Sequence, residues 1–123
     1  MSEYNFGNGL VSAHRHVNPD GSEGGWVAET AFVASSAFIG PDAKVFGNAN
    51  VYGDAVVYGN AVVGGYAWVG GYAWVCGYAK VYDNAEVYGN AWVDGNAKVY
   101  DNAEVYGNAC FGYGEGWKVS NYL

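Results

Sequence analysis

The sequence predicts an all-β fold, a triangular parallel β-solenoid with eighteen residues per coil. Two observations predict it. Alanine recurs at every sixth residue without interruption from 31 to 109, and Val, Ile or Phe stands two positions after each alanine. The segment AKVYDNAEVYGNA also occurs twice, at 79–91 and 97–109, a displacement of three six-residue repeats. Three repeats therefore complete one coil, and residues separated by eighteen positions lie directly above one another.

Each repeat is expected to form one short strand and one corner. Alanine and the aliphatic residue two positions later point to the same side of a strand, and the residue between them points outward. A helical period would carry successive alanines to different faces. The three residues that follow, most often Tyr-Gly-Asn, include types that tolerate positive φ and so permit a bend. The coils stack about 4.8 Å apart, and Ala and Val fill the interior without leaving space for a ligand.

The repeats resemble those of the hexapeptide-repeat family, whose fold is the left-handed parallel β-helix. The family motif is an aliphatic residue, three variable positions, a small residue and one more, and it matches VFGNAN, VYGDAV, VYGNAV, VYDNAE and VYGNAW. The Tyr-Gly-Asn-Ala motif is similar to that of small repeat proteins of bacteria and their phages. The resemblance implies the left-handed winding and a trimeric assembly. The length of the repeat region, at eighteen residues per coil, predicts a prism of about five coils.

The two ends of the chain lack the repeat and are expected to be caps. Residues 1–26 form the N-terminal cap, in which Asn18-Pro19-Asp20-Gly21 favours a type I turn between strands 11–17 and 22–27. The repeats occupy residues 27–111. Residues 112–123, which contain Trp117, Val119, Tyr122 and Leu123, form the C-terminal cap. Caps are expected because open solenoid ends expose unpaired strand edges.

The composition excludes several classes of partner. The formal net charge is −7, with only five Lys and Arg residues, which argues against nucleic acid or an anionic membrane surface as a partner. The first residues lack the basic and apolar regions of a signal peptide, and no apolar run is long enough for a transmembrane helix. These features leave the cellular location undetermined.

One outer face is expected to be an interface between copies of this chain. Sorting the outward residues by coil places five apolar side chains in one column: Phe38, Val56, Trp74, Trp92 and Cys110. The other two columns become charged towards the C-terminal end. A continuous apolar strip on an acidic protein favours self-association, and we expect a homotrimer. Head-to-tail filaments are the alternative mode of assembly, and β propensity alone is the alternative explanation of the strip.

The middle coil suggests a second function, in glycan or polymer binding. Its repeat sequence changes to VGGYAWVGGYAWVCGYAKV, so that tyrosine stands at the position before alanine. Aromatic faces are typical of carbohydrate sites, although stacked corner aromatics also stiffen a coil. The candidate binding residues are Trp68, Trp74, Tyr66, Tyr72 and Tyr78.

Metal ions and cofactors are not expected. His14 and His16 point to one side of a strand, where Asp20 or Glu23 could join them, but they more often form hydrogen bonds within a cap. Asp83 and Asp101 lie in one corner column and are the weak candidates for Ca²⁺. Cys76 and Cys110 are about two coils apart, too far for a disulfide.

Enzymatic activity is not expected either. Acyltransferases and γ-class carbonic anhydrases of the hexapeptide-repeat family use histidines on the coils as a general base or as zinc ligands. Residues 17–123 contain no histidine, and no loop interrupts the repeats. A structural or assembly protein is therefore the main hypothesis, glycan binding is the second, and an acyltransferase-like protein is a remote third.

Overall fold

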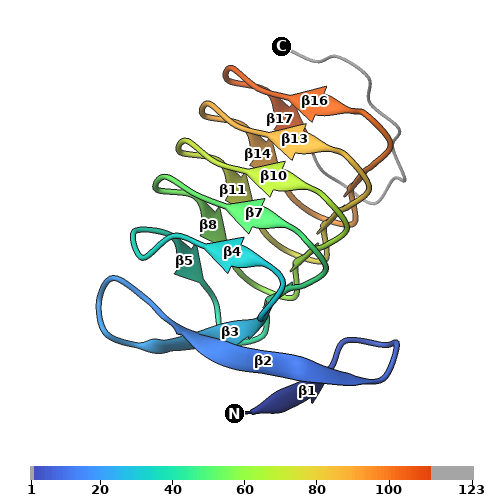
Figure 1. The fold of residues 1–123 in the computed structure, drawn as a ribbon. Helices are drawn as coiled ribbons and strands as arrows, with labels where there is room; N and C mark the ends of the chain where they lie inside the picture. Colours follow the sequence, from blue (N-terminus) through green and yellow to red (C-terminus); the bar gives the residue numbers. More distant parts are fainter. Residues whose placement is uncertain (1, 112–123) are drawn as a thin grey trace.

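The computed structural model describes residues 2–111, which form an all-β solenoid of about four turns (Figure 1). Parallel strands eighteen residues apart stack in three columns, as the repeat predicts. The described residues cover four coils and part of the expected fifth. The predicted C-terminal cap, with Trp117, Val119, Tyr122 and Leu123, lies outside the described residues.

Three sheets form the faces of the prism. Face 1 is a seven-stranded sheet, in the order β1 (Glu3–Asn5), β2 (Leu10–Val17), β3 (Glu23–Ala28), β6 (Lys44–Val45), β9 (Val62–Val63), β12 (Lys80–Val81) and β15 (Lys98–Val99). Face 2 has five strands, β4 (Phe32–Val33), β7 (Asn50–Val51), β10 (Trp68–Val69), β13 (Glu86–Val87) and β16 (Glu104–Val105). Face 3 also has five, β5 (Phe38–Ile39), β8 (Val56–Val57), β11 (Trp74–Val75), β14 (Trp92–Val93) and β17 (Cys110–Phe111).

The register between coils follows the predicted eighteen-residue displacement. Trp74 pairs with Val56 below and Trp92 above, and Lys80 pairs with Lys98. The interior column of alanines and aliphatic residues is buried, with 0% exposure for every described valine from 45 to 105 at these positions. Because each interior position touches an equivalent residue above and below, the core is continuous along the axis and leaves the outer faces to carry function.

The N-terminal hairpin lies at the lower end of the solenoid and continues face 1 beyond β6 (Figure 1). β2 and β3 pair antiparallel, with His14 opposite Val27, and β3 then pairs in parallel with β6. The connecting turn has the predicted hydrogen bond, from the N–H of Gly21 to the carbonyl of Asn18 at 2.8 Å. β1 extends the sheet by pairing with β2, an additional strand that the repeat pattern did not predict.

From residue 47 to residue 107, every corner contains one residue with positive φ. Gly47, Gly65, Asp83 and Asp101 form one such column, with φ near +60° for all four. An added Cβ on Gly65 would lie 2.7 Å from the backbone nitrogen of Asp83, so close stacking as well as φ favours glycine there. Aspartate is one of the few other residues that adopt this conformation, which explains why it replaces glycine in the two upper coils.

Candidate functional site

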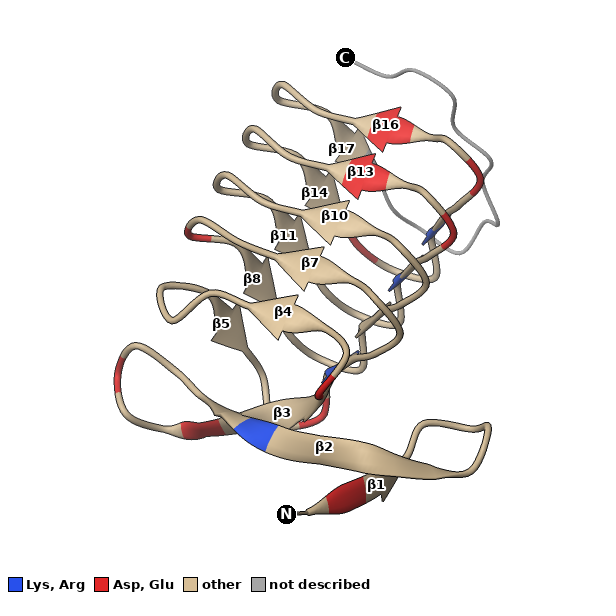
Figure 2. Ribbon diagram, in the orientation of Figure 1, with Lys and Arg blue, Asp and Glu red and all other residues tan. Residues whose placement is uncertain are grey.

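The outer columns differ in charge, as Figure 2 shows. Face 1 presents Lys44, Lys80 and Lys98, and face 2 presents Glu86 and Glu104 in its upper strands. The register places like charges above one another, since Glu86 pairs with Glu104 and Lys80 with Lys98. Face 3 has no charged residue in its outward column: Phe38, Val56, Trp74, Trp92 and Cys110. It is therefore the least polar of the three outward columns.

The apolar strip on face 3 is ordered by stacked rings. Trp74 and Trp92 lie parallel, with ring centroids 4.9 Å apart and planes 5° apart, and Tyr58 meets Trp74 edge-on at 5.6 Å. These contacts leave Trp74 partly buried, whereas Trp92 is 41% exposed. The structure thus brings the predicted interface residues into one column and places a rigid pair of indoles at its upper half.

The candidate glycan residues are distributed around the prism instead of forming one patch. Trp68 lies on face 2 and Trp74 on face 3, while Tyr66, Tyr72 and Tyr78 stand at three different corners, each 62% exposed. A single short oligosaccharide could therefore contact only part of the predicted set. The structure brings Trp68 close to Tyr52 instead, edge-on at 5.7 Å.

The altered repeat sequence of the middle coil is explained by packing against the coil below. The ring of Tyr52 leans onto Gly70 in the coil above, where an added Cβ would lie 2.0 Å from the ring. Phe46 leans onto Gly64 in the same way, with a corresponding distance of 2.7 Å. The middle coil therefore has no room for its own aromatic residue at these positions, and its tyrosines stand two residues later, at the last corner position before alanine, where they are exposed. In the upper coils, where that position is again tyrosine, Tyr82 stacks on Tyr100 at 5.5 Å.

At the third corner Cys76 takes the place of glycine. Its side chain is buried, and the hydroxyl of Tyr58 forms a hydrogen bond with its thiol. This hydrogen bond, with burial second, raises the pKa of Tyr58 to about 12. Burial raises the pKa of the Cys76 thiol, and the Tyr58 hydroxyl offsets part of that effect by stabilising the thiolate. Cys76 and Cys110 are both free thiols, in agreement with the predicted absence of a bridge between them.

The strongest polar arrangement lies beneath β5, the lowest strand of face 3. The Oδ1 of Asn18 accepts the N–H of Ile39 at 2.8 Å, and its Nδ2 donates to the carbonyl of Ile39 at 3.1 Å. The Nε2 of His16 donates to the carbonyl of Ala37 at 2.8 Å, because a carbonyl can only accept. Two side chains thus satisfy the three backbone groups of β5 that point away from the stack. Gly24 makes room, since an added Cβ would lie 2.3 Å from the Ile39 oxygen.

The predicted metal candidates are used in other ways. His14 contacts Glu29, with 2.6 Å between Nδ1 and Oε2, so the carboxylate beside it is neither Asp20 nor Glu23. Asp20 instead accepts bonds from the hydroxyl and N–H of Ser22, which lower its pKa. Asp83 accepts the N–H of Asp101 at 3.1 Å. Within residues 2–111 no three His, Cys, Asp or Glu residues gather in a way that could hold a metal ion.

Sequence analysis missed an aromatic cluster against face 1. Tyr4 stacks on Trp26 at 5.0 Å, Phe6 stacks on Phe46 at 5.3 Å, and Arg15 lies over Trp26 with 5.4 Å from Cζ to the ring centroid. The alternation of Tyr4 and Phe6 before Gly7 and Gly9 was the signal for this strand and its loop. The cluster holds β1 and the following loop against the corner at Phe46.

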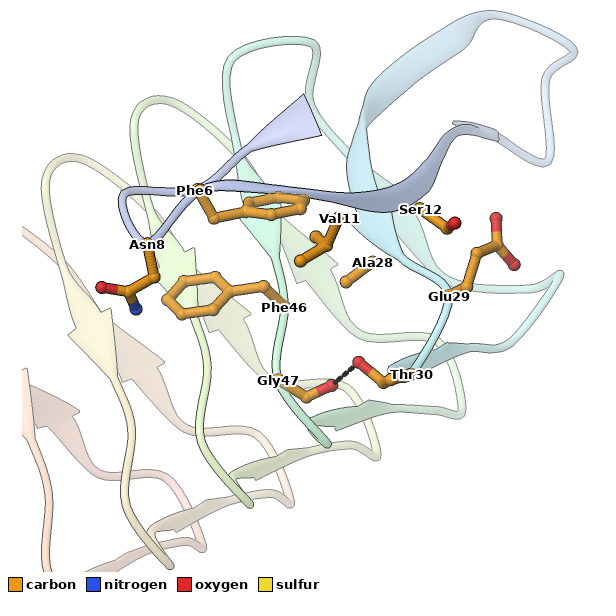
Figure 3. Close-up of a pocket in the computed structure, with 10 residues that line it drawn as sticks. Phe6, Asn8, Val11, Ser12, Ala28, Glu29, Thr30, Phe46 and Gly47 are labelled. Carbon is orange, nitrogen blue, oxygen red and sulfur yellow. Dashed lines mark hydrogen bonds between the residues drawn. The ribbon is translucent and has the colours of Figure 1, made fainter. Parts of the chain in front are cut away.

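A cavity of about 510 Å³ opens beside this loop (Figure 3). Phe6, Val11 and Phe46 supply its apolar wall, and Glu29 stands at the opposite side. Thr30 donates a hydrogen bond to the carbonyl of Gly47 and so closes its floor. The volume is in the range of small-molecule sites. Its one carboxylate is already paired with His14, however, which leaves few polar groups to select a ligand.

Among the described residues no helix has the length and apolar character needed to cross a membrane. No family model, curated protein or solved structure matches this chain.

Proposed function

We propose that this chain is a non-enzymatic assembly protein of the hexapeptide-repeat type, a rigid left-handed solenoid that joins copies of itself through face 3. The expectation of a trimer, and of a bacterial or phage source, comes from the sequence resemblance. The observation that supports assembly is the uncharged outward column of face 3, in which Trp74 and Trp92 are held in a parallel stack 4.9 Å apart. Such a flat, pre-ordered aromatic surface loses little side-chain entropy when another copy covers it.

The lower end of the molecule favours this lateral assembly over head-to-tail filaments. Asn18 and His16 occupy the lower edge of β5, and β3, β2 and β1 continue the sheet beneath β6. A second prism could not form a continuous three-sheet stack against this end without displacing the cap. Closed assembly through a face is therefore the better supported mode.

The test is the mass of the protein in solution, measured by light scattering after size-exclusion chromatography over a hundredfold concentration range. Wild-type protein is expected to show a constant mass of three chains, and the double variant Trp74→Ser, Trp92→Ser the mass of one. Trp68→Ser is the matched control, since it removes an exposed indole from face 2 and should leave the mass unchanged. A monomeric wild type, or a double variant with the wild-type mass, would contradict the proposal.

Glycan or polymer binding is a second candidate, supported by the equal 62% exposure of Tyr66, Tyr72 and Tyr78. Their separation restricts the ligand to a long polymer or to one corner at a time. Trp68, which lies on face 2 between the corners of Tyr66 and Tyr72, is the natural reporter because it is 48% exposed. Quenching of its fluorescence by oligosaccharides, lost in Trp68→Phe and in Tyr72→Ala, would support this function. A flat response across a broad panel would count against it.

A further inference from the structure

The first strand of face 2, β4, has an unoccupied lower edge. Strands β4 and β5 are equivalent by the six-residue repeat, so Ala31 and Val33 correspond to Ala37 and Ile39. In both strands the residue between these two donates its N–H upward: Phe32 to the carbonyl of Ala49, and Phe38 to that of Ala55. The residue after them does the same, since Ala34 donates to Val51 and Gly40 to Val57. The N–H of Val33 and the carbonyls of Ala31 and Val33 therefore point downward, like the groups of β5 that Asn18 and His16 satisfy.

The equivalent groups of β4 have no such partners. No residue within 2–111 forms a hydrogen bond with the N–H or carbonyl of Val33 or with the carbonyl of Ala31. β4 is also an end strand of its sheet. One donor and two acceptors thus remain along an extended backbone, in the spacing that another strand would match.

The side chains around this edge are correspondingly exposed. Ala31 and Val33 are only partly buried, although Ala37 and Ile39 have 0% exposure. Phe32, on the outer surface of the same strand, is 55% exposed. An added strand with apolar residues at alternate positions would cover Ala31 and Val33 from below, and its outward residues would lie beside Phe32.

We propose that the lower edge of β4 is a docking site for one extended peptide segment, which adds a sixth strand to face 2. The partner chemistry follows from the edge: a free backbone for the three hydrogen bonds, small or β-branched apolar residues facing inward, and basic residues facing outward. Basic residues suit the formal charge of −7. His16 and Asn18 beneath β5 and β3 beneath β6 occupy the positions that a second prism would need, whereas the addition of one strand requires only the edge of β4.

The experiment uses an acetylated and amidated peptide of alternating Val and Lys, added to isotope-labelled protein. The control peptide has the same number of lysines but Pro at its central positions, so it cannot complete the edge. Peptide binding is expected to slow amide hydrogen exchange at Val33 about tenfold or more, while exchange at Ile39 stays unchanged. Equal effects of both peptides, or protection that leaves Val33 unchanged, would overturn the proposal.

Val33→Pro is the variant that tests the edge directly, because it removes the only downward donor and leaves the upward bonds of Phe32 intact. It is expected to weaken peptide binding about tenfold or more, the loss that one or two hydrogen bonds produce. Phe46→Ala, in the cavity wall, should bind the peptide as the wild type does. Retained binding in Val33→Pro, or lost binding only in Phe46→Ala, would place the peptide elsewhere and refute the inference. Trp74→Ser, Trp92→Ser should also retain binding, so this result is independent of the proposed lateral assembly.

Discussion

β4 and β5 are consecutive strands with the same hydrogen-bonding pattern, yet their lower edges are finished differently. Beneath β5, the amide of Asn18 takes both polar groups of Ile39 and His16 takes the carbonyl of Ala37. Beneath β4, the corresponding groups of Ala31 and Val33 have no partner among residues 2–111. The fold therefore seals one edge with side chains and leaves its neighbour available.

The difference shows what a solenoid cap must accomplish. An asparagine amide has the same donor and acceptor as a peptide group, so a single residue from the hairpin replaces one unit of a missing strand. A hydrophobic side chain would cover the interior but would leave the backbone of Ile39 unpaired. At β5, side chains thus replace the hydrogen bonds of a missing strand, and at β6 the strand β3 continues the sheet. β4 has neither kind of cap among residues 2–111.

The largest expected effect comes from removing the amide that seals β5. Asn18→Ala leaves the N–H and carbonyl of Ile39 buried without partners, which should lower the free energy of unfolding by about 2–4 kcal/mol. Exchange at the Ile39 amide should rise to the level of Val33. Urea denaturation followed by tryptophan fluorescence measures the change in the free energy of unfolding. Asn60→Ala, at an exposed corner, is the control and should change stability by less than about 0.5 kcal/mol. Equal stabilities of the two variants would show that the cap is not held by this amide.

His16 should contribute less, because it satisfies one group. His16→Ala is expected to cost about 1–2 kcal/mol, through the loss of its bond to the buried carbonyl of Ala37. His14→Ala removes the neighbouring imidazole, which is half exposed and paired with Glu29, and should cost about 1 kcal/mol or less. The same denaturation measurement compares them. A larger loss in His14→Ala would reverse the roles assigned to the two histidines.

A substitution at the open edge of β4 should, in contrast, change the free energy of unfolding very little. Val33→Pro removes an N–H that has no partner within residues 2–111, in a strand conformation that proline tolerates at a sheet edge. Its cost should be about 1 kcal/mol or less, reflecting the changed packing of a partly buried side chain. Thermal unfolding followed by circular dichroism provides the comparison with Asn18→Ala. A loss as large as that of Asn18→Ala would mean that β4 is sealed after all.

The repeated part of the fold was predictable to the level of single positions. The spacing of Ala and Val fixes which side chains point inward, and the eighteen-residue displacement fixes the pairs across coils, such as Trp74 with Trp92 and Lys80 with Lys98. Both follow from strict periodicity, because each coil repeats the environment of the one below. The type I turn at Asn18 was predictable for a local reason, its sequence preference.

The parts outside the repeat were not predictable in the same way. Asn18 was recognised as a turn residue, but its contact with Ile39, twenty-one positions away, depends on how the hairpin folds beneath the coil. The packing of Tyr52 onto Gly70 requires the tilt of a ring, which a pattern of residue types does not contain. The spread of Tyr66, Tyr72 and Tyr78 over three corners did follow from the period, and it limits the glycan hypothesis that the same pattern suggested.

The last prediction concerns a contact inside the stack, where β8 and β11 have strand partners on both sides and no edge is involved. The hydrogen bond with Cys76 and burial raise the pKa of Tyr58 from 10.0 to about 12. Folding thus favours the neutral phenol of Tyr58. The contribution of this raised pKa to the free energy of unfolding is complete below pH 10, declines as the unfolded chain ionises first, and is lost as the pH rises through 12. Tyr58→Phe should therefore lose stability less steeply than the wild type in this alkaline range, as measured by urea denaturation at successive pH values. In Asn18→Ala the free energy of unfolding should fall with pH as steeply as in the wild type, because the substituted side chain does not contact Tyr58 or Cys76. If the dependence on pH changed equally in both variants, the cap, and not the Tyr58–Cys76 contact, would govern alkaline unfolding.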